Sequence, residues 1–187
     1  MDKDIKIASH NTMSYLPVKQ WYLKPFYWMA RCQNKSIFQQ YNEGCRFFDI
    51  RVKYYKGKIY FAHGIILYKG DVWKILRDFH NYISESVIIR FILETSKEDI
   101  SMEEEFYYDC MTIQTVFPKF KTHGGRRKFD WHVIFPFDQK EPTIEQKVSS
   151  MTGNIFDDIW PWLYAKLHNK ENIKKGTDKE YLMIDFI

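Results

Sequence analysis

The sequence predicts an α/β protein built on mainly parallel strands, and three observations support this fold class. Short apolar segments alternate with segments of helical spacing along most of the chain. Residues 87–93 are apolar except for Arg90, which is typical of a parallel strand covered on both faces. The length of 187 residues suits one domain. Because complete (β/α) barrels run to about 250 residues, we expect residues 1–187 to form one compact, distorted or incomplete barrel.

The expected elements follow from local patterns of apolar and turn-forming residues. Strands are expected over residues 5–9, 45–52, 59–62, 87–93, 131–135 and 181–186. Helices are expected over residues 71–84, 103–114 and 156–169, where apolar residues recur at helical spacing. The aromatic segment 17–40 should be a loop followed by a helix into Tyr41, which Gly44 ends. Residues 121–128 and 172–179 are expected to form polar loops.

Composition and targeting signals narrow the class of protein. Lys and Arg number 28 and Asp and Glu number 24, so the formal net charge is 28 − 24 = +4. This mild excess favours anionic partners, and no nucleic-acid-binding module accompanies it. Cys32, Cys45 and Cys110 form no C-x-x-C pair, so we expect buried reduced thiols. No signal peptide or apolar stretch of about 18 residues is visible. We therefore expect a cytoplasmic or released soluble protein, of undetermined oligomeric state.

Polar residues stand where four of the expected strands end. These positions are His10 with Asn11, Asp49 with Arg51, His63 with Gly64, and Glu94, while Asp185 lies inside the last expected strand. In a parallel barrel the carboxyl ends of the strands form one rim, and catalytic groups assemble there. We therefore expect these side chains, although far apart in sequence, to converge on one site.

The residue types at these positions suit phosphodiester cleavage. Two histidines titrate near neutral pH, so one can accept a proton while the other donates one. Arg51 could bind the phosphate oxygens in a bidentate manner, and an aspartate could orient one imidazole. Together these groups could catalyse attack of a neighbouring hydroxyl on phosphorus, which gives a cyclic phosphate. Each residue alone also has a structural explanation, such as an ion pair between Arg51 and Asp49 on one strand face.

Several of these residues lie in a series of short motifs between residues 5 and 95. In chain order these are Ser9-His10-Asn11-Thr12, Gln39-Gln40, Gly44-Cys45-Arg46-Phe47-Phe48-Asp49-Ile50-Arg51 and His63-Gly64. Each motif alone is weak, but their order and spacing resemble the X-region of phosphatidylinositol-specific phospholipase C. The resemblance implies a distorted TIM barrel that cleaves phosphatidylinositol or a related inositol-phosphate diester.

The resemblance also implies a role for each residue at the expected site. His10 would deprotonate the inositol 2-hydroxyl, and His63 would protonate the departing diacylglycerol oxygen. Arg51 matches the arginine of the metal-independent bacterial enzymes, and Asp49 matches an acidic residue found two positions earlier. Asp185 is similar, more loosely, to a late aspartate that supports the first histidine.

Two further residues depart from the bacterial pattern and leave the question of a metal open. Asn11 and Glu94 resemble calcium-ligand positions of the eukaryotic enzymes, yet Arg51 would repel a cation within its reach. We therefore expect no metal cofactor, with calcium as the alternative, and expect Asn11, Glu94 and Arg126 to contact substrate. A second hypothesis is a metal-dependent glycerophosphodiesterase-like enzyme that binds magnesium or calcium through Asn11, Asp49 and Glu94. A third is a barrel that only binds phospholipid headgroups or a protein.

Two segments could contact a membrane surface. Trp21, Tyr22 and Trp28 lie in the aromatic segment where the bacterial relatives insert a helix into the lipid interface, and such rings suit that depth. Ordinary packing of these rings on the barrel is the alternative. The basic residues 124–128 could hold a phosphate or an anionic membrane surface, or form a solvated loop.

Overall fold

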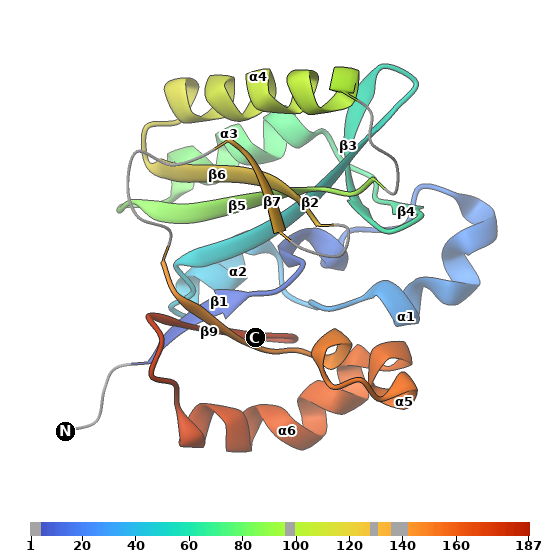
Figure 1. The fold of residues 1–187 in the computed structure, drawn as a ribbon, viewed down its shortest axis with the longest axis vertical. Helices are drawn as coiled ribbons and strands as arrows, with labels where there is room; N and C mark the ends of the chain where they lie inside the picture. The colour runs from blue at the N-terminus through green and yellow to red at the C-terminus, as the bar shows by residue number, and fades with distance from the viewer. Residues whose placement is uncertain (1–4, 96–99, 128–130, 136–141) are drawn as a thin grey trace.

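The computed structural model describes residues 5–95, 100–127, 131–135 and 142–187. Within them one nine-stranded sheet has the order β7-β6-β5-β2-β1-β9-β8, and β3 and β4 extend from β2 (Figure 1). The strands are β1 (Lys6–Ser9), β2 (Phe47–Tyr55), β3 (Lys58–His63), β4 (Ile66–Leu67), β5 (Val87–Leu93), β6 (Phe120–Arg127), β7 (Trp131–Phe135), β8 (Ile144–Lys147) and β9 (Tyr181–Ile184).

The helices are short apart from three. They are the α-helices α1 (Tyr27–Ala30), α2 (Ile37–Asn42), α3 (Val72–Tyr82), α4 (Ile100–Val116), α5 (Ile155–Ile159) and α6 (Pro161–Lys175), and the 3₁₀ helices η1 (Thr12–Tyr15), η2 (Trp21–Phe26) and η3 (Ser149–Met151). Of these, none is both long and apolar enough to cross a lipid bilayer in the part of the chain that the structure describes.

The sheet is an incomplete parallel barrel, which confirms the predicted fold class. Every pairing along the path from β6 through β5, β2, β1 and β9 to β8 is parallel. Between the described residues of β7 and β8, the two ends of the sheet, no pairing closes the barrel. In Figure 1, α3 and α4 cover one side of the curled sheet, and α5 and α6 lie beyond β9 on the other.

Two apolar clusters hold the sheet and position the site. The larger cluster fills the space between the outer face of the sheet and helices α2, α3 and α4. The predicted helix over 71–84 is confirmed as α3, which buries Val72, Leu76 and Phe79. The smaller cluster lies inside the curl and includes Ala8, Phe47 and Met183 from three neighbouring strands. Strand side chains alternate, so positions 10, 49 and 185, each two residues further on, continue this inner face.

The expectation that His63 ends a parallel strand is corrected. β3 is antiparallel to β2, and the two are joined by Lys56 and Gly57, both with positive φ. Such a two-residue turn can only form a hairpin. β2 extends beyond its last pairing with β5 at Val52, and β3 pairs with this extension and runs back towards the rim. His63, at the end of β3, therefore still reaches the rim.

Residues 121–128 were expected to form a loop, but residues up to Arg127 belong to β6; Lys128 lies outside the described residues. Lys, His, Gly and Arg have little intrinsic preference for strands, so pairing with β5 decides this structure. Gly124 is needed because α4 packs closely here. A Cβ atom at this position would lie 2.7 Å from Cys110 Sγ and 2.7 Å from Phe106 Cε1.

The last third of the chain differs from expectation in its helix boundaries. The single predicted helix over 156–169 is divided into α5 and α6 at Trp160, because Pro161 starts a new helix at its first position. Helix α6 then continues to Lys175, into the segment 172–179 that was expected to be a loop. β8 falls where no element was expected. The three cysteines are free and buried, as predicted.

Candidate functional site

The site begins at a left-handed turn at the end of β1. Asn11 has a φ of 43°, a conformation that asparagine tolerates better than most residues. Its backbone N–H donates to Asp49 Oδ2 at 3.1 Å, which fixes the turn against β2. The preceding backbone N–H, that of His10, donates to the carbonyl of Ile184 on β9 at 3.1 Å. These two bonds hold His10 over the inner face of the sheet.

The imidazole of His10 is held at both nitrogens. Nδ1 lies 2.6 Å from Asp185 Oδ1, and Nε2 lies 2.7 Å from Nη2 of Arg51. A guanidinium only donates hydrogen bonds. Nε2 therefore accepts and carries no proton in this arrangement, whereas Nδ1 donates to the carboxylate. This is the tautomer that a general base needs at Nε2.

Asp185 is fully buried directly after β9. Its Oδ2 atom accepts the backbone N–H of Ser149 at 3.0 Å. Burial raises the pKa of Asp185, but the neighbouring His10 and the Ser149 N–H outweigh burial, so the pKa is lowered overall. The carboxylate therefore stays charged, and it can favour a protonated His10 once that imidazole has accepted a proton.

Arg51 links the groups of the site through three hydrogen bonds. Besides His10, its Nε donates to Asp49 Oδ2 at 3.3 Å and its Nη1 donates to Glu94 Oε1 at 3.1 Å. We name the five residues joined in this way the rim cluster: His10, Asp49, Arg51, Glu94 and Asp185. Burial disfavours the charge of Arg51, but Asp49 and Glu94 outweigh this and raise its pKa. The guanidinium thus supplies a fixed positive charge at the rim.

Asp49 is stabilised as an anion by a second arginine. Nε and Nη2 of Arg90 on β5 both lie 3.0 Å from Asp49 Oδ1. Burial raises the pKa of Asp49, but Arg90, Arg51 and His10 more than compensate, and the pKa is lowered. Arg90 was not proposed for the site. Its only sequence signal was a charge within an apolar run.

His63 lies beside the rim cluster, half-buried at the end of β3. Its Nδ1 donates to the carbonyl of Ala30 at 3.1 Å, so Nε2 is the unprotonated nitrogen. Burial lowers the pKa of His63 to about 4; Arg51 and His10 act in the same direction, and Glu94 opposes them. Both imidazoles therefore lie within electrostatic reach of one guanidinium. With a pKa of about 4, His63 is neutral at pH 7.

The structure does not bring Arg126 to the rim cluster. Gly124, two residues earlier, faces α4, and strand alternation puts Arg126 on the same outward side. Arg126 there forms an ion pair with Glu103 of α4. Asn11 does join the site, and its Nδ2 lies 3.9 Å from Cys32 Sγ.

Cys32 and Gln33 contact the site although no sequence motif pointed to them. They precede α2, and the carbonyl of Cys32 accepts the N–H of Phe186 at 2.7 Å. The Nε2 atom of Gln33 donates to the carbonyl of His10 at 3.1 Å. Sequence patterns could not identify either residue as part of the site, because the hydrogen-bond partners of both lie on segments distant in sequence.

One group of three possible metal ligands occurs among the described residues, formed by His10, Cys32 and Asp185 with ligand atoms within 4.8 Å of one another. The group is a poor fit for a cation. His10 Nδ1 and Asp185 Oδ1 already bond to each other, and Arg51 places positive charge on the other side of the imidazole. Burial raises the pKa of the Cys32 thiol well above its usual value, so the thiolate that a metal prefers is also disfavoured.

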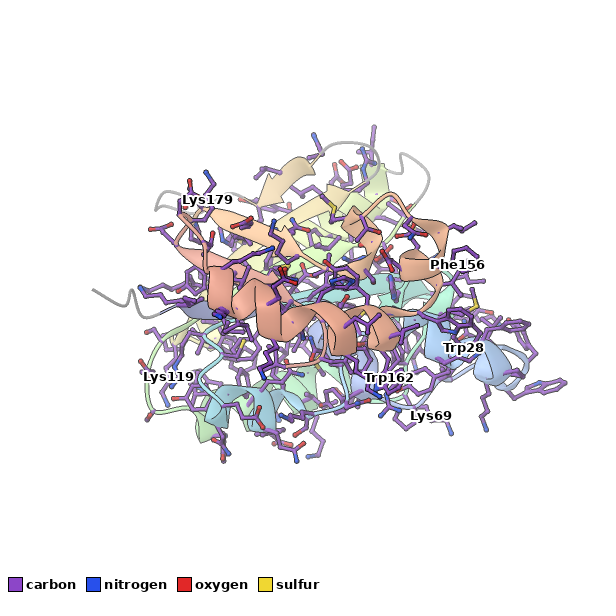
Figure 2. All side chains as sticks on the ribbon, turned by 90° about the horizontal axis from the view of Figure 1, so that it is seen from below. Trp28, Lys69, Lys119, Phe156, Trp162 and Lys179 are labelled. Atoms are coloured by element: carbon purple, nitrogen blue, oxygen red, sulfur yellow. The ribbon has the colours of Figure 1, made fainter. Side chains whose placement is uncertain are left out.

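An exposed aromatic surface lies next to the site. We define it by eight exposed apolar side chains, of which seven are aromatic: Trp21, Tyr22 and Phe26 of η2, Trp28 of α1, Ile155 and Phe156 of α5, Trp160 between α5 and α6, and Trp162 of α6. Trp28 stacks on Trp160 with ring centroids 5.7 Å apart, and Figure 2 shows Trp28, Phe156 and Trp162 on the same side of the molecule. Trp28 and Trp160 thus pack partly on each other, whereas Trp21 and Phe156 are mostly exposed. A cavity of about 300 Å³ between Trp28, Trp160, Trp162 and Phe186 extends from this surface to the residue after Asp185.

Comparisons with known proteins agree with the resemblance. A PI-PLC X-box domain-containing protein from Dictyostelium discoideum is 31% identical over 97 residues, which cover 52% of this chain and 13% of that protein. No protein-family model matches the chain.

Solved structures share the fold over nearly the whole chain. Phosphatidylinositol-specific phospholipase C from Listeria monocytogenes is 19% identical with a TM-score of 0.60, covering 97% of this chain and 88% of that one. A phosphatidylinositol-specific phospholipase C from Staphylococcus aureus is 16% identical with a TM-score of 0.62, covering 98% and 86%. The predicted resemblance to this family and the predicted incomplete TIM barrel are confirmed.

Proposed function

We propose that this chain is a phosphodiesterase that cleaves phosphatidylinositol, or a related inositol-phosphate diester, through a cyclic phosphate, and that residues 1–187 act as one catalytic domain. The observation that carries the proposal is the position of His10 between Asp185 and Arg51, with His63 within electrostatic reach of the same guanidinium. The likeness to phosphatidylinositol-specific phospholipases C supports the substrate class.

The first half of the reaction is assigned to His10. Arg51 would transfer its Nη2 donor from His10 to a non-bridging phosphate oxygen, which frees Nε2 of His10. That nitrogen would accept the proton of the inositol 2-hydroxyl as the hydroxyl oxygen forms its bond to phosphorus. Asp185 would stabilise the resulting imidazolium through the 2.6 Å contact with Nδ1.

The second half is assigned to His63. The bond between phosphorus and the lipid oxygen breaks, and His63 would donate a proton to that oxygen. In the free protein the pKa of His63 is about 4, so the imidazole must gain its proton in the complex. A bound phosphodiester carries negative charge, which favours the protonated form. The same binding would draw Arg51 towards the phosphate and weaken its repulsion of this proton.

We propose that the reaction needs no metal, with the guanidinium of Arg51 as the site's cation. Arg51 bonds Asp49 and Glu94, two of the residues that a metal-dependent enzyme would use as ligands. A calcium titration tests this: activity should be the same with added calcium and with chelator. Strict dependence on calcium would show that the carboxylates serve a metal.

We further propose that the aromatic surface contacts the membrane that holds the substrate. Trp21 and Phe156 are 77% and 65% exposed. Aromatic rings of this kind favour the boundary between lipid and water.

The proposed reaction is tested by incubating the protein with phosphatidylinositol vesicles and following phosphorus NMR. We expect inositol 1,2-cyclic phosphate to appear together with diacylglycerol. Direct formation of an acyclic inositol phosphate, with no cyclic intermediate, would instead indicate activated water as the nucleophile. A protein that binds the vesicles without releasing either product would be a headgroup-binding barrel.

A further inference from the structure

Gln33 is a fully buried glutamine in the segment between α1 and α2. Its amide group has no exposed surface. A buried amide costs free energy unless its hydrogen bonds are made inside the protein. The partners of Gln33 therefore indicate what this residue holds in place.

The carboxamide of Gln33 joins three backbone segments. Nε2 donates to the carbonyl of His10 at 3.1 Å and to the carbonyl of Ile184 at 3.2 Å. Oε1 accepts the N–H of Ile187 at 3.1 Å. The backbone N–H of Gln33 donates to Ser14 Oγ at 2.9 Å, which anchors the base of the side chain.

These contacts surround the His10–Asp185 pair. Asp185 directly follows Ile184, so one NH₂ group holds the backbone of His10 and the residue before its carboxylate partner. Ile187 lies two residues beyond Asp185, so Oε1 holds the other side of the same turn. A small shift of either segment would lengthen the 2.6 Å contact between His10 Nδ1 and Asp185 Oδ1.

We propose that Gln33 is a positioning residue for the reaction, which acts by fixing the distance and angle between His10 and Asp185. The inference rests on the proposed function of His10 as general base. Gln33 does not touch substrate, and its effect passes through the two side chains that it aligns. Misplacement of a catalytic group by about 1 Å can lower a rate by about 100-fold.

Gln40 provides a matched control. It is equally buried, and its Nε2 donates to the carbonyls of Thr12 and Lys35 at 3.1 and 2.7 Å. Gln33→Met and Gln40→Met remove the same groups and keep the volume of the side chain. Both variants should lose stability in denaturant titrations, because each removes two hydrogen bonds that a buried side-chain amide donates to backbone carbonyls.

Only Gln33→Met should change the catalytic pair. We expect its kcat on phosphatidylinositol to fall by at least about 10-fold with KM within about two-fold, and Gln40→Met to keep kcat within about two-fold of wild type. In proton NMR, the Nδ1 proton of His10, assigned by its loss in Asp185→Asn, should shift or broaden in Gln33→Met alone. Gln33→Asn, which retains the amide on a shorter side chain, replaces Gln33→Met if that variant does not fold.

The two readouts separate two kinds of failure. Equal losses of kcat in the Gln33 and Gln40 variants, or an unchanged His10 proton signal in the Gln33 variant, would overturn the positioning role. A wild-type protein that cleaves no phosphatidylinositol, although its His10 signal depends on Gln33, would overturn the proposed function instead.

Discussion

The two halves of the chain contribute to the site in different ways. Residues 5–95 supply four of the five residues of the rim cluster, and His63 beside it, from positions within or directly after β1, β2, β3 and β5. Residues 100–187 supply Asp185, which no strong motif marks, and α5 and α6 of the aromatic surface. The reactive groups of the first half can thus be identified from neighbouring residues in the sequence. The contribution of the second half depends instead on the positions that its residues take in the folded protein.

The largest expected effects on kcat test whether Asp185 contributes as much to catalysis as the residues of the first half. His10→Ala, His63→Ala and Asp185→Ala should each lower kcat by at least about 100-fold, because each removes a proton-transfer group or its orienting partner. The double variant His10→Ala/Asp185→Ala should lose little more than His10→Ala, because the two residues act as a unit. Near wild-type turnover in Asp185→Ala would confine the chemistry to the first half.

Arg51→Lys tests the cation of the rim cluster. An ammonium group cannot reproduce the fork that contacts His10, Asp49 and Glu94, nor bind a phosphate in a bidentate manner. We expect kcat/KM to fall by about 100-fold. Arg46→Lys is the control, since Arg46 pairs with Glu85 near the surface, and its kinetics should match wild type. Equal activity in both variants would argue against phosphate binding by Arg51.

Gly124→Ala tests a structural requirement of the second half. The new methyl group would meet Cys110 Sγ and Phe106 at 2.7 Å, so β6 or α4 must shift. Overpacking of this kind costs about 1–3 kcal/mol, measurable as a lower free energy of unfolding in urea. Adding Cys110→Ala should recover part of the loss. If the two losses simply add, the contact with Cys110 is not the cause.

The aromatic surface offers a comparison between its two contributing segments. Trp21→Ala from the first half and Phe156→Ala from the second should each weaken sedimentation with phosphatidylinositol vesicles by up to about 10-fold, because each removes one apolar ring from the lipid boundary. Tyr108→Ala, an exposed ring on α4, is the control and should bind as wild type. A loss in only one of the two variants would assign membrane contact to that segment alone.

The smallest expected effect concerns the protonation of His63. Its pKa should be about 4 in the free protein, because burial and Arg51 disfavour the imidazolium. Bound myo-inositol 1-phosphate adds negative charge, which favours the imidazolium and should raise the pKa by at least about two units in an NMR titration, so that part of the His63 population carries a proton near pH 7. An unchanged value in the complex would leave His63 neutral at pH 7 and unsuited to protonate the leaving group.

Local patterns predicted much of the fold and nearly all of the rim cluster. The apolar run of residues 87–93 indicated a covered parallel strand, and it is β5, which Glu94 follows directly. Gly44, with a φ of 92°, follows the end of α2 as expected. These features succeed because apolar periodicity and backbone preference are properties of a few neighbouring residues.

The features that local patterns missed depend on partners distant in sequence. β6 carries residues that disfavour strands and is a strand because β5 offers it a paired edge. Arg126 was expected at the site, yet the register of β6 turns it towards Glu103. Gln33 has no motif, and its role emerges only where β1 and β9 meet.

The sequence by itself determined which groups can react: two imidazoles, a guanidinium and their carboxylates, each within a strand or directly after one. The tertiary structure alone decided which of them meet, which face each strand presents, and that several aromatic rings remain exposed. The physical reason is that chemistry and local burial reside in single residues and their neighbours. Pairing register and packing are instead set by contacts between segments up to 175 positions apart, the separation of His10 and Asp185.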